Sequence, residues 1–203
     1  MSFILDLIYP RSCFGCGHSG IYLCPICRTK IVTKSIRRGD RLSLFRYHGA
    51  VKKLIIDLKF HFVSDVTDEL SSLIADSITT KYPNLLSYWQ EKAFVLVPIP
   101  LHHYRFNWRG FNQSVIVCQQ LSSKLKLHFD PSVLQRVKHS IPQTKVTNKL
   151  HRRQNVASSF EITNSKYQNV IIFDDVYTTG STISAAKSVF TKTTQVWTLT
   201  IAG

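Results

Sequence analysis

The sequence lacks any uninterrupted apolar run of about 18 residues, the length that a membrane-spanning helix requires. The apolar run Phe3–Tyr9 carries Asp6 and has no basic leader, so it lacks the layout of a secretory signal peptide. Internal repeats and low-complexity segments are missing as well. These absences exclude the membrane-spanning and repeat classes, and we expect a globular protein of the cytoplasm.

Acidic residues are scarce: 12 Asp and Glu stand against 26 Lys and Arg, which gives a formal net charge of +14 over 203 residues. A balance this basic favours polyanionic partners such as phosphorylated metabolites, nucleic acid or an anionic membrane surface. Charge alone carries no specificity, so a merely soluble basic protein is the alternative interpretation. The length allows one well-cored domain with a small appendage.

Disulfide bonds are not the first expectation for the five cysteines, because we expect a cytoplasmic setting. Four of them form two C-x-x-C pairs with seven residues between the pairs: Cys13, Cys16, Cys24 and Cys27. Each pair can direct two thiolates at one tetrahedral ion, so the pattern predicts a structural zinc site rather than a redox pair or free thiols. His18 could replace one ligand but is expected to be a loop residue, and Cys118 is expected in the core.

The stretch Val170–Thr182 has the most informative pattern in the chain. It begins with the apolar residues of a buried strand and continues with Asp174 and Asp175. A turn of small residues then runs into a helix predicted over Ile183–Phe190. A strand, a loop and a helix N-terminus in this order bring backbone N–H groups together at the positive end of the helix dipole. The pattern therefore predicts an anion site.

The side chains of this loop suit a ribose that bears a 5-phosphate. Hydroxyl donors for the phosphate come from Thr178, Thr179, Ser181 and Thr182. Gly180 allows the backbone to approach a phosphate closely, while Asp174 and Asp175 can accept hydrogen bonds from sugar hydroxyls or hold Mg²⁺ through them. A capped strand-to-helix turn is the alternative, but the loop resembles the phosphoribosyl pyrophosphate signature of the type I phosphoribosyltransferase fold.

A second buried strand, Phe94–Val97, also ends in a loop with basic residues. In an open parallel sheet, ligands gather where the carboxyl ends of strands meet their loops, so we expect this loop to lie beside Asp174. Its basic side chains suit a diphosphate, with a solvated basic loop as the alternative. They are His102, His103, Arg105 and Arg109.

The segment Leu134–Phe160 is a long, basic connection with little apolar periodicity and few aromatic residues. Such a connection inside a compact domain is usually functional or disordered. It is expected to be either a lid that closes over a bound anion, with Arg152 near the diphosphate, or a surface for single-stranded nucleic acid that includes Arg152 and Arg153.

Shorter patterns predict the remaining elements. The strands are expected over Leu42–His48 and Gln195–Ile201, and the helices over Val51–Phe60 and Val66–Thr79. In the first helix, Lys52, Lys53 and Lys59 are expected to point outward. The segment Lys81–Lys92, which contains Pro83, is predicted to be a break between helix and sheet.

Several stretches together resemble the ComF family of competence proteins. They are the cysteine module after F-I-L-D-L-I-Y-P, the segment Y-H-G-A-V-K-K-L-I-I-D-L-K-F, V-P-I-P-L-H followed by R-G-F-N-Q-S, the stretch from Gln143 through Arg152 to Phe160, and D-D-V-Y-T-T-G-S-T. They run in family order over nearly the whole chain. One departure is Phe62-Val63, because family members often have a Gly soon after L-K-F-H.

The resemblance implies a zinc-finger module over residues 1–38 joined to a phosphoribosyltransferase-type α/β domain over residues 39–203, with a doubly wound, mainly parallel sheet. It implies a role in natural transformation, in which the protein binds phosphoribosyl pyrophosphate with Mg²⁺, handles internalised single-stranded DNA in the cytoplasm and meets other DNA-uptake proteins. Asp174 and Asp175 would be the catalytic residues of any transfer. Two other functions stay open: a phosphoribosyltransferase of nucleobase or amine salvage, and a sensor that binds the donor without transferring it.

Overall fold

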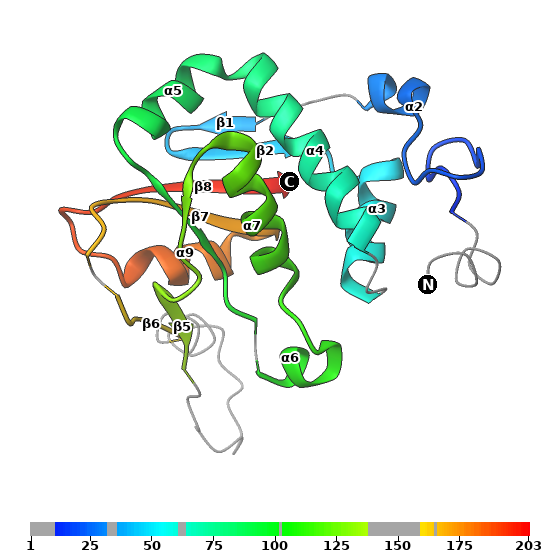
Figure 1. The fold of residues 1–203 in the computed structure, drawn as a ribbon. Helices are drawn as coiled ribbons and strands as arrows, with labels where there is room; N and C mark the ends of the chain where they lie inside the picture. Colours follow the sequence, from blue (N-terminus) through cyan, green and yellow to red (C-terminus); the bar gives the residue numbers. More distant parts are fainter. Residues whose placement is uncertain (1–10, 32–35, 61–63, 102, 138–158, 165) are drawn as a thin grey trace.

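A computed structural model describes residues 11–31, 36–60, 64–101, 103–137, 159–164 and 166–203. Its centre is a six-stranded sheet in the order β1 (Ile36–Arg38), β2 (Arg41–Phe45), β8 (Gln195–Ala202), β7 (Asn169–Val176), β3 (Val95–Pro98) and β4 (His128–Phe129) (Figure 1). Only the β1–β2 hairpin is antiparallel, and the other four pairings are parallel. The predicted α/β class with a mainly parallel sheet is therefore confirmed.

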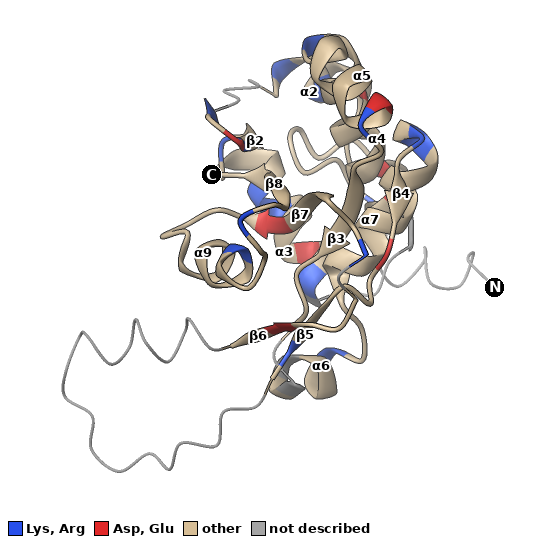
Figure 2. Ribbon diagram, turned by 90° about the vertical axis from the view of Figure 1, so that its left-hand side faces the viewer, with Lys and Arg blue, Asp and Glu red and all other residues tan. Residues whose placement is uncertain are grey.

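Helices cover both faces of the sheet. Alternation along β7 decides which side chains meet which helices, because successive residues of a strand point to opposite faces. Ile171 and Phe173 belong to the larger buried cluster, with α3 (Gly49–Phe60), α4 (Ser64–Lys81), α5 (Pro83–Glu91) and α7 (Gln113–Leu125). Val170 and Ile172 belong to the second cluster, with α9 (Ser181–Ser188). Figure 2 shows α9 on one side of the sheet and α4 and α7 on the other.

The connections from β3 and β7 leave these neighbouring strands in opposite directions. β3 continues through α6 (His103–Arg109) and α7 to β4, whereas β7 continues through α9 to β8 on its other side. The two connections also lie on opposite faces of the sheet. Ligands of open parallel sheets bind at such a switch point, outside the carboxyl ends of the strands. The fold thus places the end of β7 where a ligand is expected.

The segment predicted to be a break between helix and sheet is a helix, and that prediction is wrong. α5 begins at Pro83, which occupies its first turn, and only Tyr82 separates it from α4. Proline is well tolerated at a helix start because its missing N–H would have no partner there. The helix buries Leu85 and Trp89, which lie four residues apart and so share one face.

The two ends of the polar segment Leu134–Phe160 lie in two paired strands. β5 (Leu134–Arg136) pairs antiparallel with β6 (Phe160–Ile162), and both strands pack on the α9 side of the sheet. Arg152 and Arg153 lie outside the described residues, as does the departure from the family pattern at Phe62-Val63. The lid and the nucleic-acid surface predicted for this segment therefore stay predictions.

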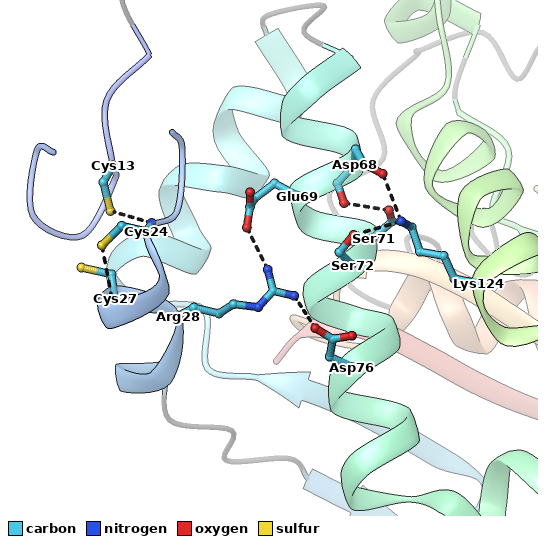
Figure 3. Close-up of polar contacts among 10 residues, drawn as sticks. All are labelled: Cys13, Cys24, Cys27, Arg28, Asp68, Glu69, Ser71, Ser72, Asp76 and Lys124. Carbon is cyan, nitrogen blue, oxygen red and sulfur yellow. Dashed lines mark hydrogen bonds and ion pairs between the residues drawn. The ribbon is translucent and has the colours of Figure 1, made fainter. Parts of the chain in front are cut away.

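The cysteine module packs directly on the α/β core. Leu23, Cys13 and Cys27 belong to the same buried cluster as the inner faces of α3 and α4. Arg28 of α2 (Pro25–Lys30) donates hydrogen bonds to Glu69 at 2.8 Å and to Asp76 at 2.6 Å, both on α4 (Figure 3). The predicted module boundary at residue 38 stays a prediction; β1, which ends there, pairs with β2 in the main sheet. Within the described residues, no helix has the length and apolar character needed to cross a membrane.

Candidate functional site

The sulfur atoms of Cys13, Cys16, Cys24 and Cys27 all lie within 4.8 Å of one another. Sγ of Cys16 and Sγ of Cys24 are 3.7 Å apart. Zinc–sulfur bonds of about 2.3 Å in a tetrahedron give sulfur–sulfur distances of about 3.8 Å, so this spacing fits one tetrahedral ion. His18 is exposed and is not part of the cluster, as expected. The four thiols can therefore hold a metal ion such as zinc.

The backbone of the module is shaped around these sulfurs. The N–H of Cys24 donates to Sγ of Cys13 at 3.3 Å, and the N–H of Cys27 donates to Sγ of Cys24 at 3.4 Å. A Cβ atom on Gly15 would lie 2.6 Å from Sγ of Cys27, so only glycine fits at this position without moving a ligand. Pro25 then starts α2 directly after Cys24.

The thiols of Cys13 and Cys27 have pKa values shifted in opposite directions. Burial opposes ionisation of Cys13, but N–H donors, first that of Cys24, outweigh it and lower the pKa of Cys13 to about 6. Hydrogen bonding to Cys24, with burial second, raises the pKa of Cys27 to about 12. Without a metal ion the cluster therefore keeps a mixture of thiolate and thiol, and a divalent ion would favour the deprotonated form of all four.

The second site lies at the carboxyl end of β7. Asp174 and Asp175 lie just before Val176, the last residue of the strand, and the N–H of Asp175 donates to Oδ1 of Asp174 at 2.9 Å. The alternation of the strand separates their side chains. Asp175 points to the face of α3 and α7, whereas Asp174 points to the face of α9, where the turn of small residues begins the helix. The two carboxylates, predicted as equivalent, have different surroundings.

Asp175 is buried and already has partners. Its Oδ2 lies 2.6 Å from Nζ of Lys59, in the last turn of α3, and accepts a hydrogen bond of 3.3 Å from Nε2 of Gln113, the first residue of α7. The prediction that Lys59 points outward is therefore wrong. The signal was present in the sequence, because Lys59 continues the stripe of Val51 and Ile55 at four-residue spacing, and both of those residues are buried.

Asp174 is half-buried and has a raised pKa of about 7. Burial is the main cause, and the negative charge of Asp175 is the second. The positive charges of Lys59 and Arg136 act in the opposite direction. A carboxylate held near its titration point at neutral pH gains most from a cation or from hydroxyl donors. Such perturbed acids are concentrated at functional sites.

The turn after β7 presents its hydroxyl groups to solvent. Thr178, Thr179 and Ser181 are exposed, Thr182 is half-buried, and α9 has no acidic residue in its first turn. Oγ of Ser181 lies 3.1 Å from Oγ1 of Thr179. Gly180 has φ +75°, and a side chain there would collide with the Tyr177 ring. These features suit an anion at the N-terminus of α9.

The loop after β3 is linked to Asp175 by hydrogen bonds through Gln113. Nη1 of Arg109 donates to Oε1 of Gln113 at 3.2 Å, and Gln113 in turn donates to Asp175. Asn112 fixes the start of α7, because its Oδ1 accepts from the N–H of Ser114 and its Nδ2 donates to the carbonyl of Ile99. Arg109 is thus linked through Gln113 to Asp175, the neighbour of Asp174, and the predicted position of the loop beside Asp174 stays a prediction.

The other residues predicted for the diphosphate include His103, which begins α6. Arg105 lies within α6, whereas His102 and Arg152 lie outside the described residues. Gln113 was not predicted as a site residue. The sequence did indicate its position, because it directly follows Asn112, which caps the helix after the loop. Cys118 is fully buried on α7, as predicted.

Curated relatives share substantial identity with the chain. It is 37% identical over 110 residues to Competence protein F of Haemophilus influenzae, which covers 50% of this chain and 48% of that protein. It is 30% identical over 165 residues to Competence protein ComFC of Bacillus subtilis, covering 80% of this chain and 62% of that protein. DNA utilization protein YhgH of Escherichia coli O157:H7 is 29% identical over 158 residues, covering 75% and 68%. The chain thus spans about half the length of the first relative and less than two thirds of the second. No family model matches the chain.

Proposed function

Because the chain belongs to the ComF family of competence proteins, we propose that it binds phosphoribosyl pyrophosphate with Mg²⁺ at the carboxyl end of β7. We also propose that it handles internalised single-stranded DNA in the cytoplasm during natural transformation. The names of the relatives, which refer to competence and DNA utilization, support the second part. The net charge of +14 supports a polyanionic partner. A structural zinc ion on the four cysteines completes the proposal.

One observation carries the donor-binding part. A buried strand carries two carboxylates near its carboxyl end and leads through a hydroxyl-rich turn into the N-terminus of α9. This is the point where neighbouring strands of a parallel sheet send their connections in opposite directions. Hydroxyl and N–H donors suit the 5-phosphate, and a carboxylate suits the ribose hydroxyls or Mg²⁺. A ligand that carries both a 5-phosphate and ribose hydroxyls would contact the turn and the carboxylate together. The arrangement supports a phosphoribosyltransferase-type fold for this domain.

Each residue of the site has a separate role in the proposed binding of the donor. The turn Thr178–Thr182, with its glycine and hydroxyls, holds the 5-phosphate. Asp174 faces the ribose and Mg²⁺, because it lies on the same face of β7 as α9 and because burial raises its pKa to about 7. Asp175 is a positioning residue, since Lys59 and Gln113 already contact its carboxylate. Arg109, which donates to Gln113, lies on the side proposed for the diphosphate, and His102, Arg105 and Arg152 are proposed to join it.

Whether the donor is consumed depends on an acceptor. Transfer breaks the bond between the anomeric carbon and the diphosphate oxygen, forms a bond from that carbon to the acceptor, and releases diphosphate. Diphosphate release with a panel of nucleobases and amines therefore separates a salvage enzyme from a protein that only binds the donor. Release that requires single-stranded DNA would make the DNA the acceptor or the activator.

Calorimetry with phosphoribosyl pyrophosphate and Mg²⁺ tests the donor site. Thr179→Val removes one hydroxyl donor to a charged group, and we expect binding to weaken by about 1–3 kcal/mol. The matched control is Thr193→Val, which changes an exposed threonine of the loop between α9 and β8 in the same way and should leave the affinity unchanged. A wild-type protein that ignores the donor at millimolar concentration would refute the site. Equal losses in both variants would refute the assignment of the phosphate to this turn.

A further inference from the structure

A cavity of about 580 Å³ lies where the cysteine module meets the α/β core, apart from the carboxylate site. The module contributes Gly15, Cys27 and Lys30 to its lining. The other wall is the connection from β2 to α3 together with the first turn of α3, including Arg46, His48 and Val51. We call this cavity the module groove. Both of its walls are therefore fixed parts of the fold, the metal-binding cluster on one side and a sheet-to-helix connection on the other.

The module groove is basic, and no acidic side chain is among its described lining residues. Lys30, Arg46 and His48 line it with their side chains exposed, and its lining contains no Asp or Glu. Within the described part of the chain, none of these three side chains takes part in an ion pair or a hydrogen bond. Four cations elsewhere in the molecule do pair with a carboxylate: Arg28, Lys59, Lys124 and Lys187. Cations gathered around a concavity without a counter-charge raise the local concentration of anions.

The surface next to the module groove is basic as well. Lys52 and Lys53 follow on the first turns of α3, and Nζ of Lys53 donates to the carbonyl of Phe14 at 3.2 Å, so the helix is tied to the cysteine module. The Tyr47 ring is 37% exposed and lies 5.9 Å from Nζ of Lys52. An exposed aromatic ring among basic side chains is the composition of surfaces that bind single-stranded nucleic acid.

We propose that the module groove binds the phosphate backbone of single-stranded DNA, with a base stacked on Tyr47. This inference rests on the DNA-handling part of the proposed function and gives it a surface. Charge complementarity selects the occupant, since two cations without a carboxylate partner among the described residues, Lys30 and Arg46, suit a chain of phosphates. The Tyr47 ring favours a nucleic acid over a simple anion, because only a nucleic acid has bases that can stack on the ring.

The position of α3 relates this groove to the donor site. The helix begins with Gly49 at the module groove and carries Lys59, which reaches Asp175, in its last turn. Lys59 lies ten positions after Gly49, and at a rise of about 1.5 Å per residue the two residues lie about 15 Å apart along the helix. DNA in the groove and a donor at the end of β7 would therefore lie near each other without sharing a residue.

The test measures binding of a fluorescent oligodeoxythymidylate to the zinc-loaded protein by anisotropy over a series of salt concentrations. Wild type should lose affinity as salt rises, with a slope of log K against log salt near −0.7 per neutralised phosphate. Lys30→Ala with Arg46→Ala should reduce the magnitude of this slope by about 1.4, for two phosphate contacts. The matched control, Lys81→Ala with Lys92→Ala, removes the same charge from exposed positions at the ends of α4 and α5 and should keep the wild-type slope.

Two further variants test the stacking. Tyr47→Ala should weaken binding about tenfold, whereas Tyr47→Phe keeps the ring and should bind as wild type does. Unchanged zinc content and unchanged circular dichroism in every variant exclude misfolding as the cause. Vesicles with anionic lipid and inorganic phosphate serve as competitors. Displacement of the oligonucleotide by inorganic phosphate at low millimolar concentration, or groove-dependent binding to the vesicles alone, would overturn the proposal.

The outcomes separate this inference from the proposed function. If wild type binds the oligonucleotide and the groove variant keeps the wild-type slope, the module groove is wrong while DNA handling stands. If wild type does not bind the oligonucleotide at any salt concentration, the DNA part of the proposed function fails together with the groove. Donor binding, measured by calorimetry on the same preparations, is independent of both results.

Discussion

Nζ of Lys59 lies 2.6 Å from Oδ2 of Asp175 and joins the last turn of α3 to the carboxyl end of β7. The two side chains are 22% and 10% exposed, so the pair is largely withdrawn from water. Gln113 donates to the same carboxylate from the start of α7. Three elements of the fold therefore meet at one carboxylate, and this fixes the end of β7 before any ligand arrives.

Lys59→Met should destabilise the protein, because it leaves Asp175 buried without its cation. Breaking a buried pair on one side costs about 3–5 kcal/mol, and the partial exposure of Lys59 places the expected loss at about 2 kcal/mol in urea unfolding. The double variant Lys59→Met with Asp175→Asn removes both charges and should recover part of that loss. If the double variant is as unstable as the sum of its single changes, the two side chains are not coupled.

Donor binding should depend on pH through Asp174. Its pKa is raised to about 7, so the ionised form that favours Mg²⁺ and ribose hydroxyls is populated as pH rises through that value. Affinity for the donor with Mg²⁺ should therefore increase between about pH 6 and 8, and Asp174→Asn should weaken binding and flatten the dependence. Calorimetry across this range checks the prediction. A profile that is equally steep in the Asn variant would assign the titration to another group.

The same carboxylate gives stability the opposite dependence. Because burial raises the folded-state pKa above the ordinary value of 3.8, the folded protein binds more protons than the unfolded chain between about pH 4 and 7. The contribution of Asp174 to stability is therefore fully present below pH 4 and is lost as pH rises through about 7. Urea unfolding of wild type against Asp174→Asn isolates this term, and the difference between them should grow with pH over that window. A constant difference would show that Asp174 titrates normally.

Zinc retention should depend on Gly15 as well as on the four ligands. The purified protein is expected to carry about one zinc ion, and Cys24→Ser should release it. Gly15→Ala places a methyl group against Sγ of Cys27 and should speed loss of zinc to a chelator, whereas Ser19→Ala, an exposed change in the same module, should not. Protein kept reduced throughout purification that contains no zinc by elemental analysis would refute the metal site.

Docking of the module is expected to depend on Arg28, which holds Glu69 and Asp76 of α4. Arg28→Ala should increase hydrogen exchange of residues 11–31 while leaving α7 and the sheet protected. The exposed Lys30→Ala, two residues further along α2, is the control. Equal exchange in Arg28→Ala and wild type would show that the shared apolar core alone holds the module.

Sequence patterns predicted the features that are local in the chain. The spacing of Cys13, Cys16, Cys24 and Cys27 indicated a metal cluster, and the apolar run before Asp174 indicated the strand that carries the site. Features that depend on packing were missed. Lys59 was assigned to the solvent because lysine usually lies there, and the partner that overrides this preference is more than a hundred residues away. Pro83 was taken to end regular structure, although proline equally begins a helix.

A crystal structure of the protein with phosphoribosyl pyrophosphate and Mg²⁺ is the most direct test of the central claim. Our account predicts the 5-phosphate at the N-terminus of α9, within hydrogen-bond distance of Thr179 and Ser181, and the ribose hydroxyls beside Asp174. It predicts that Lys59 stays on Asp175 in the complex. A donor bound elsewhere, or a complex in which Asp175 leaves Lys59 to contact the ribose while Asp174 does not, would contradict it.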